Sequence, residues 1–180
     1  MNTDQYIDEL IEREGGFVDH PDDRGGVTNW GITERVARAF GYHGRMQDMP
    51  RSVAKQIYLE RYWTQPGFDR VNEFAPSIAE ELLDTGVNMG QGVAVRFLQR
   101  ALNVLNQQGK TYPDVPVDGQ LGRMTIAALR AYLGSRGKDG PIVLWKMLNA
   151  QQSVRYIELA EANPSQESFQ FGWQAHRVGV

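Results

Sequence analysis

Apolar residues recur at the spacing of an α-helix along most of the chain, with polar segments rich in glycine and proline between them. This pattern predicts a mainly α protein. The first predicted helix begins at Thr3, a residue type favoured as an N-cap, and ends before Gly15. Its apolar face carries Tyr6, Ile7, Leu10 and Ile11.

Capping residues and helix stops predict where six further helices lie. Thr33 is suited to cap a short helix that Gly41 closes, and Pro76 suits the first position of another. The expected ranges are 34–40, 53–63, 76–90, 93–106, 125–133 and 141–162. Residues 107–122, rich in glycine and proline, are expected to form a structured loop. Residues 17–32 predict a small hairpin or an irregular lip.

The composition is that of an ordinary globular protein, with 180 residues, 41% hydrophobic and 23% charged. The chain has no cysteine, which excludes a disulfide scaffold. Its first residues are acidic where a signal peptide is basic, and no apolar run reaches the ~18 residues that span a bilayer. We therefore expect synthesis in the cytoplasm without a signal peptide, and no integral membrane segment.

Charge is divided unequally along the chain. Residues 1–93 hold nine Lys and Arg against sixteen Asp and Glu, a net charge of −7. Residues 94–180 hold ten against six, a net charge of +4. The difference is either surface scatter or a carboxylate-rich catalytic half joined to a half that tolerates an anionic polymer. Nucleic acid is not an expected partner, because no basic run with interleaved aromatic residues is present.

Glu14 is the first candidate for chemistry. It follows Leu10 by four residues and Ile11 by three, so helical spacing predicts that it shares their apolar face in the last turn. Desolvation and the negative end of the helix dipole both disfavour a charged carboxyl there, as a general acid requires. The alternative is a solvated glutamate at a frayed helix end.

A cluster of acids follows in the glycine-rich segment. Asp19, Asp22 and Asp23 are residue types common in polar turns, but together with Glu14 they can place two carboxyls across a cleft. Glycoside hydrolysis requires such a pair. The order lacks the alternating ligands of a calcium loop, so no metal site is expected.

The run from Glu14 to Thr33, EGGFVDHPDDRGGVTNWGIT, resembles the signature of glycoside hydrolase family 108. These proteins are N-acetylmuramidases found among phage endolysins and secretion activator proteins. Residues 83–90 resemble the second motif of that family, and residues 98–103, 117–125 and 171–178 resemble its companion peptidoglycan-binding region. The resemblance implies a lysozyme-like helical fold and a catalytic glutamate at Glu14. It implies no metal or organic cofactor.

Two regions are expected. Residues 1–93 are the lysozyme-like catalytic region, and residues 94–180 are a helical peptidoglycan-binding region. Since no linker separates them, we expect the second region to pack as part of the same unit as the first.

The other members of the site are less defined by the resemblance. Phage-type lysozymes carry Asp nine and Thr fifteen residues after the Glu; here Asp23 lies at nine, Thr28 at fourteen and Asn29 at fifteen. Asp23 and Thr28 are therefore the expected catalytic partners, with Asp22 and Asn29 as alternatives or substrate contacts. Trp30 is expected either to stack on a sugar or to pack under the hairpin.

Asn88 is expected either to hydrogen-bond an acetamido group of the sugar or to cap its helix. The expected reaction is hydrolysis of the β-1,4 bond between N-acetylmuramic acid and N-acetylglucosamine in peptidoglycan glycan strands. A lytic transglycosylase and a non-catalytic wall-binding or secretion-assisting protein are the alternatives. Without a signal peptide, the protein would reach the wall by another route, such as holin-type release.

Overall fold

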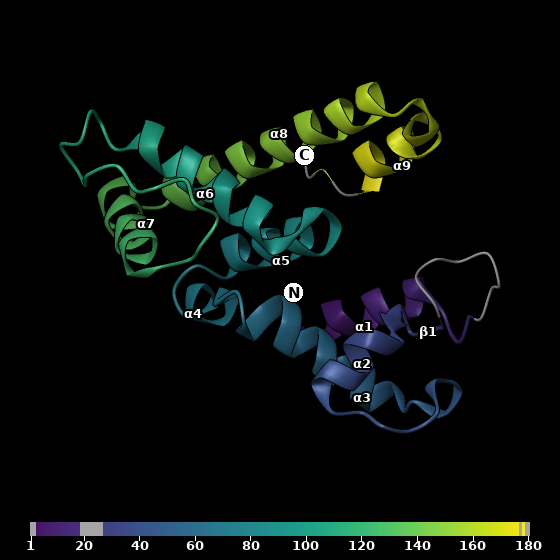
Figure 1. Cartoon of the computed structure of the whole chain (residues 1–180). Coiled ribbons are helices and arrows are strands. Elements are labelled where there is room, and N and C mark those ends of the chain that lie inside the picture. Colours follow the sequence, from purple (N-terminus) through teal and green to yellow (C-terminus); the bar gives the residue numbers. More distant parts are fainter. Residues whose placement is uncertain (1–2, 19–26, 177, 179–180) are drawn as a thin grey trace. The chain divides into compact units, whose positions relative to one another are not determined.

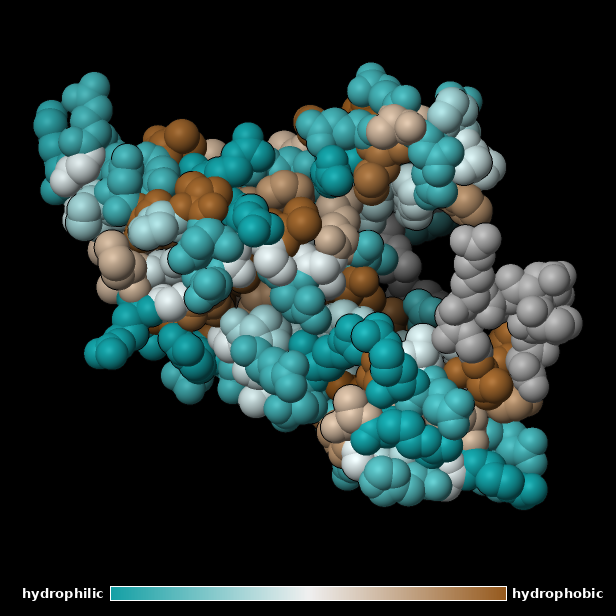
Figure 2. All heavy atoms as spheres, viewed as in Figure 1, coloured by the Kyte–Doolittle hydropathy of each residue, from teal (hydrophilic) through white to brown (hydrophobic). Residues whose placement is uncertain are grey.

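The computed structural model describes residues 3–18, 27–176 and 178. Nearly all of its regular structure is helical (Figure 1), which confirms the predicted mainly α class. The chain divides into two compact units, Met1–Gln65 and Pro66–Val180. On the face seen in Figure 2, exposed hydrophobic residues are interspersed with hydrophilic ones.

The first unit joins helices to a short hairpin. Thr33 Oγ1 accepts a hydrogen bond from the Val36 N–H at 3.3 Å, and Gly41 closes the same helix in a left-handed conformation, as predicted. The elements are α1 (Thr3–Glu14), β1 (Thr28–Asn29), β2 (Ile32–Thr33), α2 (Glu34–Phe40), the 3₁₀ turn η1 (Met46–Asp48), α3 (Arg51–Leu59) and the π-helical η2 (Glu60–Thr64).

Helix α1 packs on α3 through its apolar face. Ile7, Leu10 and Ile11 are buried there, as the helical spacing predicts. At the edge of this contact Lys55 Nζ lies 2.9 Å from Asp8 Oδ2, and Arg51 also binds Asp8. The hydrogen bonds from Lys55 and Arg51 hold the pKa of Asp8 below its ordinary value. Helix α1 is thus held against α3 by apolar packing and by a charged edge.

The second unit is a set of packed helices. Its elements are α4 (Phe68–Asn72), α5 (Pro76–Met89), α6 (Gln91–Leu105), α7 (Arg123–Arg136), α8 (Asp139–Ala162), the 3₁₀ turn η3 (Pro164–Gln166) and α9 (Glu167–His176). Helix α5 packs against α4, α6 and α8, and α8 also contacts α6, α7 and α9. Helices α4 and α9 were not predicted. Whether residues 94–180 fold with residues 1–93 as one unit stays a prediction.

The expected loop at 107–122 is held to α6 by a buried glutamine. Gln99, 1% exposed, donates from Nε2 to Asp118 Oδ1 at 2.8 Å and accepts from the Gly119 N–H at 2.9 Å. Gly119 has φ +79°, and a Cβ there would lie 2.8 Å from the Gly92 carbonyl oxygen. The Val117-Asp118-Gly119 element therefore has a structural role, because it anchors this loop to the helix.

Candidate active site

The predicted site residues fall into three groups. Glu14 is the last residue of α1, while Thr28, Asn29 and Trp30 belong to the hairpin that follows. Asn88 lies on α5 in the second unit. The predictions for Asp22 and Asp23 lie outside the described residues. Among the described residues, the first unit thus brings Glu14 and the hairpin together.

The hairpin of β1 and β2 pairs with the short segment that follows α1. Thr28 pairs with Thr33 and Asn29 with Ile32, while Val18 and Thr28 exchange two backbone hydrogen bonds of 2.9 Å. Between the strands, Trp30 and Gly31 have φ +53° and +72°. Positive φ at both central residues is the geometry of a type I′ hairpin. Tryptophan seldom adopts it, so surrounding contacts must hold Trp30 there.

Three hydrogen bonds hold this turn from outside. The buried Asn29 side chain donates from Nδ2 to the Met46 carbonyl at 2.7 Å. Trp30 Nε1 donates to the Met49 carbonyl at 3.1 Å, and Tyr58 Oη donates to the Trp30 carbonyl at 3.0 Å. The hairpin is therefore fixed to both η1 and α3.

Gly31 brings the turn against Glu14. A Cβ at this position would lie 2.6 Å from Tyr58 Oη, 2.9 Å from Glu14 Cβ and 3.0 Å from Glu14 Cγ. The Gly31 backbone therefore lies close to both the tyrosine hydroxyl and the aliphatic stem of Glu14. Only glycine fits, because the site combines positive φ with contacts too close for a side chain.

Tyr58 is a part of this site that the sequence interpretation missed. It is 4% exposed, and burial first, then the charge of Glu14, raise the pKa of its hydroxyl. The hydroxyl therefore stays protonated and donates to the Trp30 carbonyl. Its ring stacks on Tyr62 at 5.6 Å between centroids. The pattern predicted Tyr58 only as an apolar residue of its helix.

The predicted burial of Glu14 is wrong within the described structure. Leu10 and Ile11 on the same face are 2% and 0% exposed, but Glu14 is exposed. The physical reason is its position, because α1 ends at this residue and no following helical turn covers its carboxyl. The stem of Glu14 is in contact with Gly31 while the residue stays open to solvent.

Asn29 and Thr28 differ in what their side chains do. Successive residues of a strand point to opposite faces. Asn29 is 3% exposed and its amide binds Met46, whereas Thr28 is half-buried on the other face. Asn29 thus has a structural role in fixing the hairpin.

The two expected sugar contacts also have partners within the protein. The Trp30 indole is half-buried and binds the Met49 carbonyl. Asn88 is exposed, and its Nδ2 donates to the Asp84 carbonyl one turn earlier at 2.7 Å. This bond lies within α5, whose C-cap is Gly90, so Asn88 is not the cap of its helix.

A second unusual carboxyl lies in the second unit. Glu81 on α5 is 7% exposed, and its Oε2 accepts a hydrogen bond of 2.7 Å from Asn149 on α8. Burial raises the pKa of Glu81 to about 7, and the neighbouring Asp84 adds to the shift. The sequence interpretation missed it, since Glu80-Glu81 is typical of a solvated helix face.

The part of the chain that the structure describes has neither a cluster of metal ligands nor a membrane-spanning helix. Across residues 3–18 and 27–176, no three His, Cys, Asp or Glu side chains come together as metal ligands would. None of the helices described above is long and apolar enough to cross a bilayer.

Comparison with known proteins gives two family matches that together account for nearly the whole chain. Residues 7–90 match the family Glycosyl hydrolase 108, and residues 93–178 match a Predicted Peptidoglycan domain. A solved structure of SagA from Brucella abortus is similar to this chain, with a TM-score of 0.62 and 25% sequence identity. The similarity covers 95% of this chain and 86% of that one. No curated protein matches this chain.

Proposed function

We propose that this protein is an N-acetylmuramidase with Glu14 as its general acid, because residues 7–90 match the family Glycosyl hydrolase 108. It would cleave the β-1,4 bond between N-acetylmuramic acid and N-acetylglucosamine. The second matched region, at residues 93–178, supports peptidoglycan as the polymer on which this glycosidase acts.

The observation that carries this proposal is the setting of Glu14. Its stem lies against Gly31 in a turn that hydrogen bonds from Asn29, Trp30 and Tyr58 hold in place. Its exposure removes the desolvation expected from the sequence, but it leaves the carboxyl accessible to a glycosidic oxygen. A general acid needs both a fixed starting position and access to the proton acceptor.

The roles proposed for the other site residues follow from what glycoside hydrolysis requires. Asp23 stabilises positive charge on the sugar ring or positions water, and Thr28 helps to hold that water. The use of the Asn29 amide within the protein favours Thr28 for this role. Asp22 remains the alternative to Asp23, and Trp30 and Asn88 remain proposed substrate contacts.

The proposed place of action is the cell wall. Delivery to the wall by a route such as holin-type release is part of this proposal. The reaction itself needs no metal or organic cofactor.

Mass spectrometry of products from purified peptidoglycan tests this function. The expected product is a glycan fragment with a reducing N-acetylmuramic acid end. A 1,6-anhydro end would instead identify a lytic transglycosylase. Binding to peptidoglycan without release of any fragment would identify a non-catalytic wall-binding protein.

A further inference from the structure

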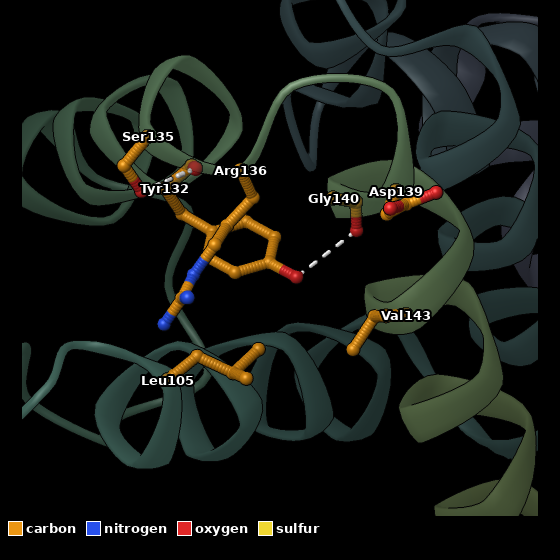
Figure 3. A pocket seen from close by; sticks show the side chains of 7 residues that line it. All are labelled: Leu105, Tyr132, Ser135, Arg136, Asp139, Gly140 and Val143. Carbon is orange, nitrogen blue, oxygen red and sulfur yellow. Dashed lines mark hydrogen bonds between the residues drawn. The ribbon is translucent and has the colours of Figure 1, made fainter.

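A cavity of about 500 Å³ lies in the second unit, lined from α6, α7 and α8 (Figure 3). Leu105 and Val143 give it apolar walls. Tyr132 and Ser135 line it from α7, and the charged side chains of Arg136 and Asp139 complete it. The volume is in the range of small-molecule sites. Every lining residue belongs to the region that matches the Predicted Peptidoglycan domain.

The cavity has a fixed floor. Tyr132 is 1% exposed, and its Oη donates to the Gly140 carbonyl at 3.0 Å, which ties α7 to the start of α8. A Cβ on Gly140 would lie 3.0 Å from Arg136 Cβ, so this glycine lets the stem of Arg136 approach α8 closely. The two charged residues therefore start from rigid positions on either side of a short turn.

The charged groups at the cavity lie at two helix ends, Arg136 in the last turn of α7 and Asp139 in the first turn of α8. Within the part of the chain that the structure describes, neither Arg136 nor Asp139 makes a side-chain hydrogen bond or an ion pair. Both are exposed. In Figure 3 the Arg136 side chain passes the Tyr132 ring, while the Asp139 carboxylate lies beyond Gly140. The cavity thus has a cationic group from the end of α7 and an anionic group from the start of α8.

Two other cavities of this unit lack this combination. In one, the acid Asp114 accepts a hydrogen bond of 2.6 Å from Asn106. In the other, Arg155 is paired with Glu158 at 3.0 Å.

We propose that this cavity binds the diamino-acid residue of a peptidoglycan stem peptide. Such a residue carries a free carboxylate and a free ammonium. Arg136 binds the carboxylate, Asp139 binds the ammonium, and the aliphatic chain lies over Tyr132, Leu105 and Val143. This inference rests on the proposed action on peptidoglycan and names the part of the polymer that the second region recognises.

Calorimetric titration of the full chain with a soluble stem tripeptide that ends in diaminopimelate tests the site. Arg136→Gln and Asp139→Asn are each expected to weaken binding about tenfold or more, the range of a lost charge-assisted hydrogen bond. Lys138→Gln is the matched control, because this exposed cation lies between the two residues without lining the cavity. It is expected to leave the affinity within about twofold, since single surface charges contribute little.

A modified peptide assigns each charge to its partner. Acetylating the side-chain amine is expected to weaken binding to the wild type, and Asp139→Asn should then have no further effect. Arg136→Gln should still weaken binding of the acetylated peptide. If both variants bind the unmodified peptide like the wild type, or if the wild type does not bind it, the site is refuted.

Fragment release from peptidoglycan by the same preparations separates this inference from the proposed function. Release without tripeptide binding refutes the site and leaves the muramidase assignment standing. Tripeptide binding that depends on Arg136 and Asp139, without release, supports the site and contradicts the muramidase.

Discussion

Replacing Glu81 by glutamine should remove a pH-dependent loss of stability. The pKa of this buried carboxyl is raised from 4.5 to about 7, chiefly by burial. The folded protein therefore binds this proton more tightly than the unfolded chain does. The stabilisation that results is fully present below pH 4.5 and is lost as the pH rises through about 7.

The size of the effect follows from the shift. At about 1.4 kcal/mol for each pH unit, a shift from 4.5 to about 7 corresponds to about 3 kcal/mol of unfolding free energy. Glutamine is neutral and keeps an oxygen that can accept the hydrogen bond now made by Asn149. Glu81→Gln should thus be more stable than the wild type near pH 8, by up to about 3 kcal/mol. Near pH 5 the difference should be small.

Urea unfolding followed by circular dichroism from pH 5 to 8 measures this difference. Glu73→Gln is the control, because Glu73 is an exposed glutamate in the same unit. It is expected to follow the wild-type pH dependence. A Glu81→Gln variant that retains the full wild-type slope, or is destabilised near pH 8, would contradict a raised pKa of Glu81 in the folded protein.

Three further predictions concern the first unit. Gly31→Ala should destabilise the protein by about 1 kcal/mol or more in thermal unfolding, because it combines positive φ with a clash; unchanged stability would contradict the proposed close contact. Tyr58→Phe should lower the free energy of unfolding by about 1 kcal/mol, because it removes the hydrogen bond to Trp30, and it should reduce the rate of hydrolysis. Tyr62→Phe, which keeps the stacked ring, should change neither the stability nor the rate by much. Thr28→Ala should slow hydrolysis, and Asp23→Asn should slow it more. Proton NMR should detect a first product with inverted anomeric configuration, and an initial β anomer would exclude the water-holding role of Thr28.

The sequence predicted the elements better than the contacts between them. The helices at α1, α2, α5, α6 and α8 follow from spacing and capping signals that act within a few residues. Thr33, Gly41 and Pro76 show this directly, because each defines a helix end through its own backbone or side chain. The short α4 and the C-terminal α9 carried no such signal that we recognised.

The parts that were missed depend on residues far apart in the chain. Tyr58 reaches the carbonyl of Trp30, and Glu81 receives its hydrogen bond from Asn149, 68 positions later. Helical spacing placed Glu14 on the apolar face, but the end of α1 leaves it exposed. Periodicity within one helix does not show which other segments contact it. For this reason the roles of Tyr58 and Glu81 were missed and the exposure of Glu14 was predicted wrongly.

Release of reducing ends from purified peptidoglycan by Glu14→Gln tests whether Glu14 is the general acid. Loss of a general acid should slow the reaction by about 10²–10⁴-fold. Glu12→Gln is the matched control, because Glu12 is an exposed glutamate of the same helix, with a side chain 73% exposed. We expect a folded, nearly inactive Glu14→Gln protein and a Glu12→Gln protein with wild-type activity. A folded Glu14→Gln protein that releases reducing ends at the wild-type rate would contradict this role of Glu14.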